Sequence, residues 1–159
     1  MNAKRFLGID YGTKRIGIAI SDEGHTLAFP RGIILNDSNM FQKFGEIIVK
    51  KGIDEVVIGE SVDFSGKLNA LSAQIEVFIS EFKEKFKLPV HKQKEFLTSV
   101  EARRHQDFSG QDRKSGSGKK PMSPSQAHSK IKQIKSGRID AFAAALILQR
   151  YLDKINNLK

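Results

Sequence analysis

The strongest constraint on the fold is a change in the spacing of apolar residues after residue 35. Before that point, apolar residues alternate with small or polar ones over 4–9, 15–21 and 28–35, which is the period of β-strands. The short links between these segments predict hairpins, and hairpins join antiparallel strands. In 15–21, Ile residues alternate with Gly, Ala and Ser, so we expect another element to pack closely over the small side chains.

After the change, segments with helical spacing alternate with two short strand-like segments, at 55–59 and from Val90 to about Glu95. Three antiparallel strands, followed by helix, strand, helix, strand and helix, predict an α/β fold. The sheet should be mixed and five-stranded, with the last two strands parallel and helices flanking it.

Residues that favour helix ends mark the helical segments. We expect Asp37 or Ser38 to cap the first helix and Gly52 to end it. Near the end of the chain, the pattern predicts a short basic helix over 125–135. A separate and largely buried helix is expected over 139–155, because that segment is apolar on nearly all sides as far as Leu148.

Length and composition limit the class of protein. A chain of 159 residues fits one domain, which we assign to 1–159. The absence of cysteine excludes a disulfide framework, a thiolate zinc site and a cysteine nucleophile. No apolar run is long enough for a signal peptide or a membrane span, so we expect a cytoplasmic protein with no membrane partner. The oligomeric state does not follow from the sequence.

Positive charge is concentrated in one part of the chain. The net charge is +9, and the segment 103–138 has ten Lys or Arg against two Asp, which is +8. Such a segment on a nearly neutral body favours an acidic polymer, nucleic acid first, as the partner. A solubilising loop is the alternative. Within it, 107–124 is rich in Gly, Ser, Lys and Pro without an apolar period, and we expect a mobile basic loop there.

Three acidic residues occupy unusual positions. Asp10 ends the first strand, before a turn at Gly12, and Glu95 ends the fifth strand. Asp140 stands one residue into the apolar last helix. Ligands of open α/β sheets collect outside the carboxyl ends of strands. If the last helix packs against that edge, the three carboxylates converge and suit Mg²⁺ or Mn²⁺.

Structural alternatives remain open for two of these acids. Asp10 could bond its own turn, as Asp residues do in hairpins. Asp140 could favour the positive N-terminus of its helix, or pair with Arg138 or another cation.

Three motifs together resemble the bacterial pre-16S rRNA nuclease family, which is also described as Holliday-junction resolvase-like. They are Gly8-Ile9-Asp10-Tyr11-Gly12-Thr13-Lys14-Arg15-Ile16-Gly17, Glu95-Phe96-Leu97-Thr98-Ser99-Val100-Glu101-Ala102, and Ile139-Asp140-Ala141-Phe142-Ala143-Ala144-Ala145 continuing to Gln149. Their order and spacing cover nearly the whole chain. The resemblance implies an RNase H-like fold and gives Asp10, Glu95 and Asp140 the catalytic, metal-holding roles.

The resulting hypothesis is a metal-dependent endonuclease that hydrolyses phosphodiester bonds in nucleic acid. The resemblance implies processing of the 5′ end of pre-16S rRNA, or resolution of branched DNA. Six basic residues are expected to neutralise the nucleic-acid backbone: Lys14, Arg15, Arg103, Arg104, Lys119 and Lys120.

Two other functions remain open. Lys94 and Phe96 stand where the family usually has an acid and an arginine. They suggest a non-catalytic nucleic-acid-binding relative with a decayed metal site. An actin-like phosphotransferase is the third hypothesis, because Asp10-Tyr11-Gly12-Thr13 resembles a phosphate loop. The chain is too short for the two lobes that such a fold needs.

Overall fold

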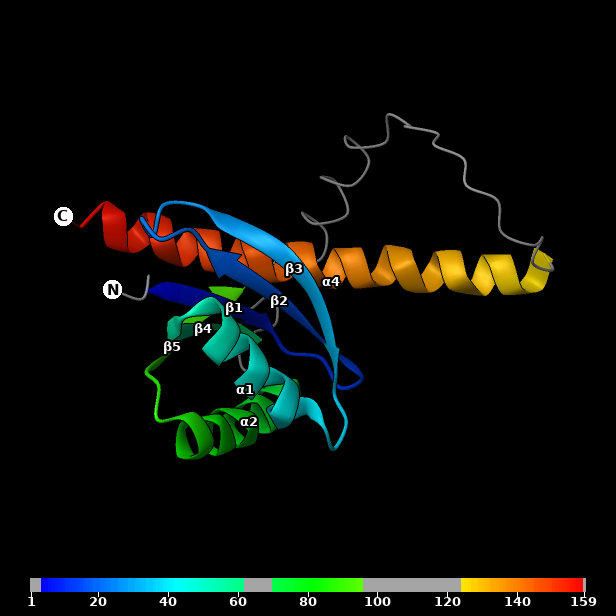
Figure 1. The fold of residues 1–159 in the computed structure, drawn as a ribbon, viewed down its shortest axis with the longest axis horizontal. Coiled ribbons are helices and arrows are strands. Elements are labelled where there is room, and N and C mark those ends of the chain that lie inside the picture. The colour runs from blue at the N-terminus through cyan, green and yellow to red at the C-terminus, as the bar shows by residue number, and fades with distance from the viewer. Residues whose placement is uncertain (1–3, 62–69, 96–123, 159) are drawn as a thin grey trace.

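The fold is that of a computed structural model, which describes residues 4–61, 70–95 and 124–158. Five strands and three helices lie in these ranges (Figure 1). In chain order they are β1 (Arg5–Asp10), β2 (Arg15–Ser21), β3 (Ala28–Leu35), α1 (Met40–Lys51), β4 (Ile53–Ser61), α2 (Ala70–Phe86), β5 (Val90–Glu95) and α4 (Pro124–Asn156). No helix within these ranges is long and apolar enough to cross a membrane.

The predicted sheet is confirmed. Its strand order is β3-β2-β1-β4-β5. The pairs β1–β2 and β2–β3 are antiparallel, whereas β1–β4 and β4–β5 are parallel. The expected bounds of β2 and β3 agree with the structure, and β4 is longer than expected by two residues at each end.

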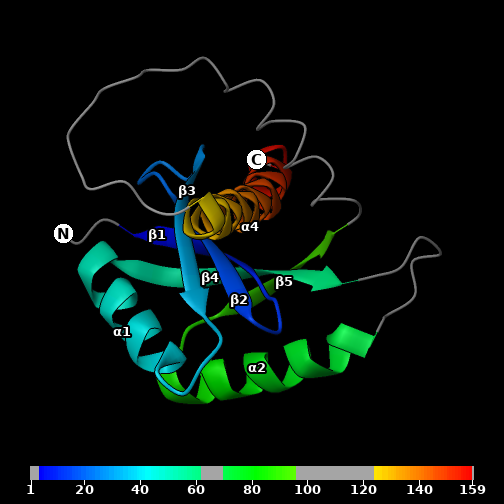
Figure 2. The same ribbon diagram turned by 90° about the vertical axis from the view of Figure 1, so that its right-hand side faces the viewer.

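Helices cover the two faces of the sheet unequally (Figure 2). Of the helices in the described ranges, α1 and α2 lie against one face and α4 against the other. The face toward α1 and α2 carries the larger core, which includes Leu7 and Ile9 of β1 and the three Ile residues of β2. The face toward α4 carries a smaller core of Phe6, Ala19, Val57 and the apolar side of the helix. The expectation of close packing over the small residues of β2 is therefore confirmed, with α4 as the packing element.

Two expectations about helix ends were wrong. α4 is one continuous helix of 33 residues, not a short basic helix followed by a separate one. Asp140 consequently lies in its interior, which excludes the alternative that the positive N-terminus of this helix stabilises its charge. At α1, the N-cap residue is Asn39, which makes no side-chain capping bond. Asp37 instead accepts a bond from the Asn39 amide through Oδ1, at 3.0 Å. Gly52 ends α1 in the left-handed conformation, as expected.

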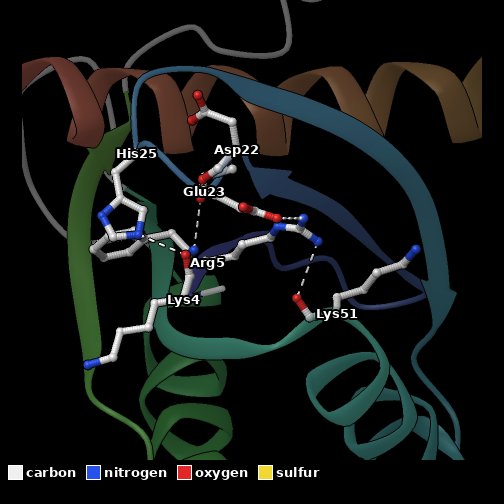
Figure 3. A network of polar contacts seen from close by, with 8 residues as sticks. Lys4, Arg5, Asp22, Glu23, His25 and Lys51 are labelled. Carbon is white, nitrogen blue, oxygen red and sulfur yellow. Dashed lines mark hydrogen bonds and ion pairs between the residues drawn. The ribbon is translucent and has the colours of Figure 1, made fainter. Parts of the chain in front are cut away.

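A polar network fixes the beginning of β1 at one end of the sheet (Figure 3). Arg5 forms an ion pair with Glu23 at 2.7 Å and donates a 3.5 Å hydrogen bond to the carbonyl of Lys51 at the end of α1. The ring of His25 bonds the carbonyl of Lys4 at 3.0 Å. These side-chain contacts join the beginning of β1 to the end of α1 and to the β2–β3 turn, and so hold these three segments together at this end of the sheet.

Candidate active site at the carboxyl ends of the strands

Asp10 lies at the opposite end of β1 from that network. It is the last residue of the strand, is half-buried, and pairs with Gly17 of β2. Side chains alternate across a strand. Phe6 belongs to the core under α4, and a Cβ at Gly8 would meet Leu148 of α4. Asp10 follows the same alternation and therefore stands on the face that α4 covers.

Gly17 brings Asp140 to the same place. A Cβ at Gly17 would lie 1.9 Å from the carbonyl oxygen of Asp140, so only glycine lets α4 approach β2 this closely. Because Gly17 is also the register partner of Asp10, the backbone of Asp140 lies over the residue beside Asp10. The structure thus brings together two of the three predicted acids, through a glycine between them.

Asp140 has an unusual electrostatic environment. Its Oδ2 lies 3.0 Å from Nε of Arg15, an ion pair between α4 and the first residue of β2. Oδ2 itself is buried, and no hydrogen bond of favourable geometry reaches it from the described residues. Burial raises the pKa of the Asp140 carboxyl above its usual value, and the positive charge of Arg15 only partly opposes that rise. The carboxylate therefore lacks full compensation for its charge.

Glu95 ends β5, where it pairs with Ser61 at the end of β4. Its side chain is not among those that the structure describes. The strand register nevertheless gives Glu95 the same position in the pleat as Asp10. Gly8, two residues before Asp10, pairs with Val57, and Val57 pairs with His91, which is four residues before Glu95. The ring of His91 stacks on Tyr151 of α4 at 5.1 Å, which shows that this alternation of β5 faces α4.

Lys94 belongs to the other face of the sheet. It follows the alternation of Lys92, which forms an ion pair with Glu76 of α2. Lys94 is exposed. The departure from the family pattern at Lys94 therefore does not put a positive charge between Asp10 and Asp140. Phe96, the other departure, lies outside the described residues.

A residue that we did not predict shapes the loop between β1 and β2. Asn36 donates a hydrogen bond to the carbonyl of Gly12 at 2.9 Å and another to the hydroxyl of Tyr11 at 3.1 Å. Its own amide donates to the carbonyl of Lys14 at 3.0 Å. Asn36 thus fixes the loop that presents Lys14 and Arg15. Its place just after β3, beside the beginning of β2, was the only available signal.

Of the predicted nucleic-acid contacts, the structure describes two. Lys14 is exposed in this loop, and Arg15 is partly exposed while it contacts Asp140. The other four predicted contacts lie outside the described residues: Arg103, Arg104, Lys119 and Lys120. The basic loop expected at 107–124 also lies outside them, except for Pro124, where α4 begins.

The residues present can be compared with the needs of a divalent cation. Mg²⁺ and Mn²⁺ bind carboxylate oxygens, and a buried carboxylate oxygen without a hydrogen bond is such a ligand. Oδ2 of Asp140 is such an oxygen among the described residues, with Nε of Arg15 3.0 Å away, and Asp10 stands beside it. No group of three acidic or histidine side chains able to hold a metal occurs among the described residues, but that set does not include the side chain of Glu95. The two described acids therefore fit a metal site that a third ligand would complete.

Known proteins identify the family. The family model "RuvX: Holliday junction resolvase" matches residues 4–154. A "Putative pre-16S rRNA nuclease" of Lawsonia intracellularis is 34% identical over 152 residues, covering 94% of each chain. A protein of the same name from Chlorobaculum tepidum is 33% identical over 151 residues, again with 94% of each chain covered.

Solved structures agree on the fold. The resolvase of Fowlpox virus, in complex with Holliday junction DNA, superposes with a TM-score of 0.53 at 14% identity, covering 95% of this chain and 98% of that one. RuvC of T. thermophilus, also with a Holliday junction, gives 0.51 at 13% identity and 96% coverage of both. These likenesses confirm the RNase H-like fold. The family model and the two relatives show that the chain belongs to the RuvX family of Holliday junction resolvase-like nucleases.

Proposed function

We propose that this protein is a metal-dependent endonuclease that hydrolyses phosphodiester bonds in structured nucleic acid. The observation that carries the proposal is the convergence of Asp10 and Asp140 across Gly17, with Oδ2 of Asp140 buried and 3.0 Å from Nε of Arg15. Membership of a nuclease family gives this pair of acids a chemical role. The pre-16S rRNA nuclease relatives favour the 5′ end of pre-16S rRNA as the substrate, with branched DNA as the second candidate.

The roles of the residues follow from their positions. Asp10 and Asp140 would hold Mg²⁺ or Mn²⁺ together with Glu95, whose place at the end of β5 matches that of Asp10 in β1. When bound, such a cation supplies Lewis-acid activation of the phosphodiester. Lys14, exposed in the adjacent loop, neutralises the phosphate backbone, so binding should weaken steeply with salt. Arg103, Arg104, Lys119 and Lys120 would extend that basic surface.

A non-catalytic relative is the competing function, and the position of Lys94 argues against it. Lys94 stands on the face of the sheet toward α2, whereas the acids stand on the face toward α4. The substitution therefore leaves the metal-holding face without an added cation.

Cleavage of defined substrates tests the proposal. A labelled RNA with the 5′ leader of 16S rRNA, and a four-way DNA junction, should be incubated with the protein and Mn²⁺ or Mg²⁺. We expect cleavage of the RNA, and loss of at least about a hundredfold in rate in both Asp10→Asn and Asp140→Asn. Glu46→Gln, an exposed acid on α1, is the matched control and should cleave normally. Salt-sensitive binding without cleavage of either substrate would favour the non-catalytic relative.

A further inference from the structure

The contact between Arg15 and Asp140 suggests a link between metal and nucleic-acid binding. We propose that Arg15 holds Asp140 in the metal-free protein and passes to a phosphate of the nucleic acid when a divalent cation binds. The two ligands would then strengthen each other's binding through this one side chain. The inference rests on the proposed function, because it takes Asp140 as a metal ligand.

The geometry of the ion pair leaves most of Arg15 available. The contact with Asp140 is made through Nε, which lies 3.0 Å from Oδ2. The terminal nitrogens make no hydrogen bond or ion pair with any described residue other than Asp140, and the side chain is 35% exposed. A guanidinium group has five N–H donors in a planar fork that matches phosphate oxygens. Arg15 therefore presents an unused phosphate-binding edge while one nitrogen is held by Asp140.

The contact with Asp140 conflicts with a divalent cation at the same carboxylate. A cation bound to Asp140 would lie within a few ångströms of Arg15, where two positive charges repel each other. Arg15 must then turn away or be neutralised by a negative partner. A phosphate is that partner in a nucleic-acid complex. After the exchange, the metal balances the negative charge of Asp140 and the phosphate balances the positive charge of Arg15.

The backbone at Arg15 is fixed, so the exchange involves only its side chain. The preceding loop is held by Asn36, which bonds the carbonyls of Gly12 and Lys14. Arg15 itself pairs with Leu35 in the β2–β3 ladder. A side-chain rotation between two partners at one position is an element with two states, which is what coupling between two ligands requires.

Coupling of this kind is reciprocal and can be measured without cleavage. The Kd for a labelled structured RNA should be measured by fluorescence anisotropy, with and without Ca²⁺, under conditions where a gel shows intact RNA. In the wild type we expect Ca²⁺ to lower the Kd by about fivefold or more. In Arg15→Gln, which keeps a hydrogen-bond donor but removes the charge, the ratio should fall below about twofold. Titration calorimetry without RNA should show tighter Ca²⁺ binding in this variant than in the wild type.

Two variants control the experiment. Lys14→Gln removes the neighbouring exposed cation, so it should weaken RNA binding by the same factor with and without Ca²⁺ and preserve the ratio. Arg15→Lys keeps a charge that can contact either partner and should retain part of the coupling. Thermal melting should confirm that each variant is folded.

The outcomes distinguish this inference from the proposed function. Measurable Ca²⁺ binding with the same Kd ratio in wild type and Arg15→Gln overturns the role of Arg15 and leaves the metal site in place. Absence of calorimetric Ca²⁺ binding by the wild type, together with absence of Mn²⁺-dependent cleavage, overturns both.

Discussion

Replacing Gly17 with alanine should separate the two acids of the candidate site. The added Cβ would lie 1.9 Å from the carbonyl oxygen of Asp140, whereas ordinary contacts begin at 3.4 Å. Helix and strand must therefore move apart by about 1.5 Å, the difference between these two distances. The atoms that the new Cβ would meet belong to the backbone of α4, which cannot turn aside as a side chain can. We therefore expect the free energy of unfolding to fall by about 3 kcal/mol, the upper end of what overpacked side chains cost.

The same movement should impair the site. A misplacement of about 1 Å at reacting groups lowers catalysis by about a hundredfold. We expect Gly17→Ala to lose at least that much in Mn²⁺-dependent cleavage, and to bind Mn²⁺ more weakly in calorimetry. Urea unfolding gives the stability change, and all activity assays should be run well below the melting temperature.

Gly8→Ala is the matched control, since it crowds the same helix at another point. Its Cβ would lie 2.7 Å from Cβ of Leu148 and 2.9 Å from the carbonyl of Ala144. We expect a stability loss of about 2–3 kcal/mol, with Mn²⁺ affinity changed less than in Gly17→Ala. Wild-type stability in Gly17→Ala would refute the close packing of α4 on β2. Equal loss of Mn²⁺ affinity in both variants would refute the location of the site at this crossing.

Three further predictions concern single substitutions. Gly137→Ala should raise the free energy of unfolding by about 1 kcal/mol in urea denaturation, because it removes a helical glycine and its Cβ would meet Ile33 at an ordinary 3.6 Å. Asp22→Asn should lower stability at neutral pH by about 1 kcal/mol at most. Hydrogen bonds within the β2–β3 turn lower the pKa of Asp22 in the folded state. Its contribution is therefore present at neutral pH and lost below about pH 4, and melts of both proteins across pH should converge there. Asn36→Ala should weaken RNA binding in anisotropy by several-fold, since it releases the carbonyl of Gly12.

The sequence predicted the sheet because each strand follows a simple period. The alternation of Ile with small residues in β2 even indicated the close approach of α4. The continuity of α4 was missed because Ser136 and Gly137 look like a break. A glycine inside a helix costs only about 1 kcal/mol, which packing of the following apolar turns against the sheet outweighs.

The site could be predicted only in part. Strand ends indicated Asp10 and Glu95, and the apolar surroundings singled out Asp140. The ion pair between Arg15 and Asp140 depends on where α4 crosses β2, which no local pattern specifies. The role of Asn36 could not be predicted for the same reason, because its partners Gly12 and Lys14 lie in the loop between β1 and β2, more than 20 residues earlier in the chain.

The path of α4 also sets when the site can form during synthesis. Asp10 is made early, but Asp140 reaches it only after α4 has docked on the sheet. That docking includes a hydrogen bond from the amide of Ala28 to the side chain of Gln149, across 121 positions of the chain. Asn156 adds a bond to the carbonyl of His25. A ribosome-bound chain that ends before residue 140 lacks the second acid, and one that ends before Gln149 lacks both of these docking bonds. We therefore expect Asp10 and Asp140 to come together only after the last helix has been made.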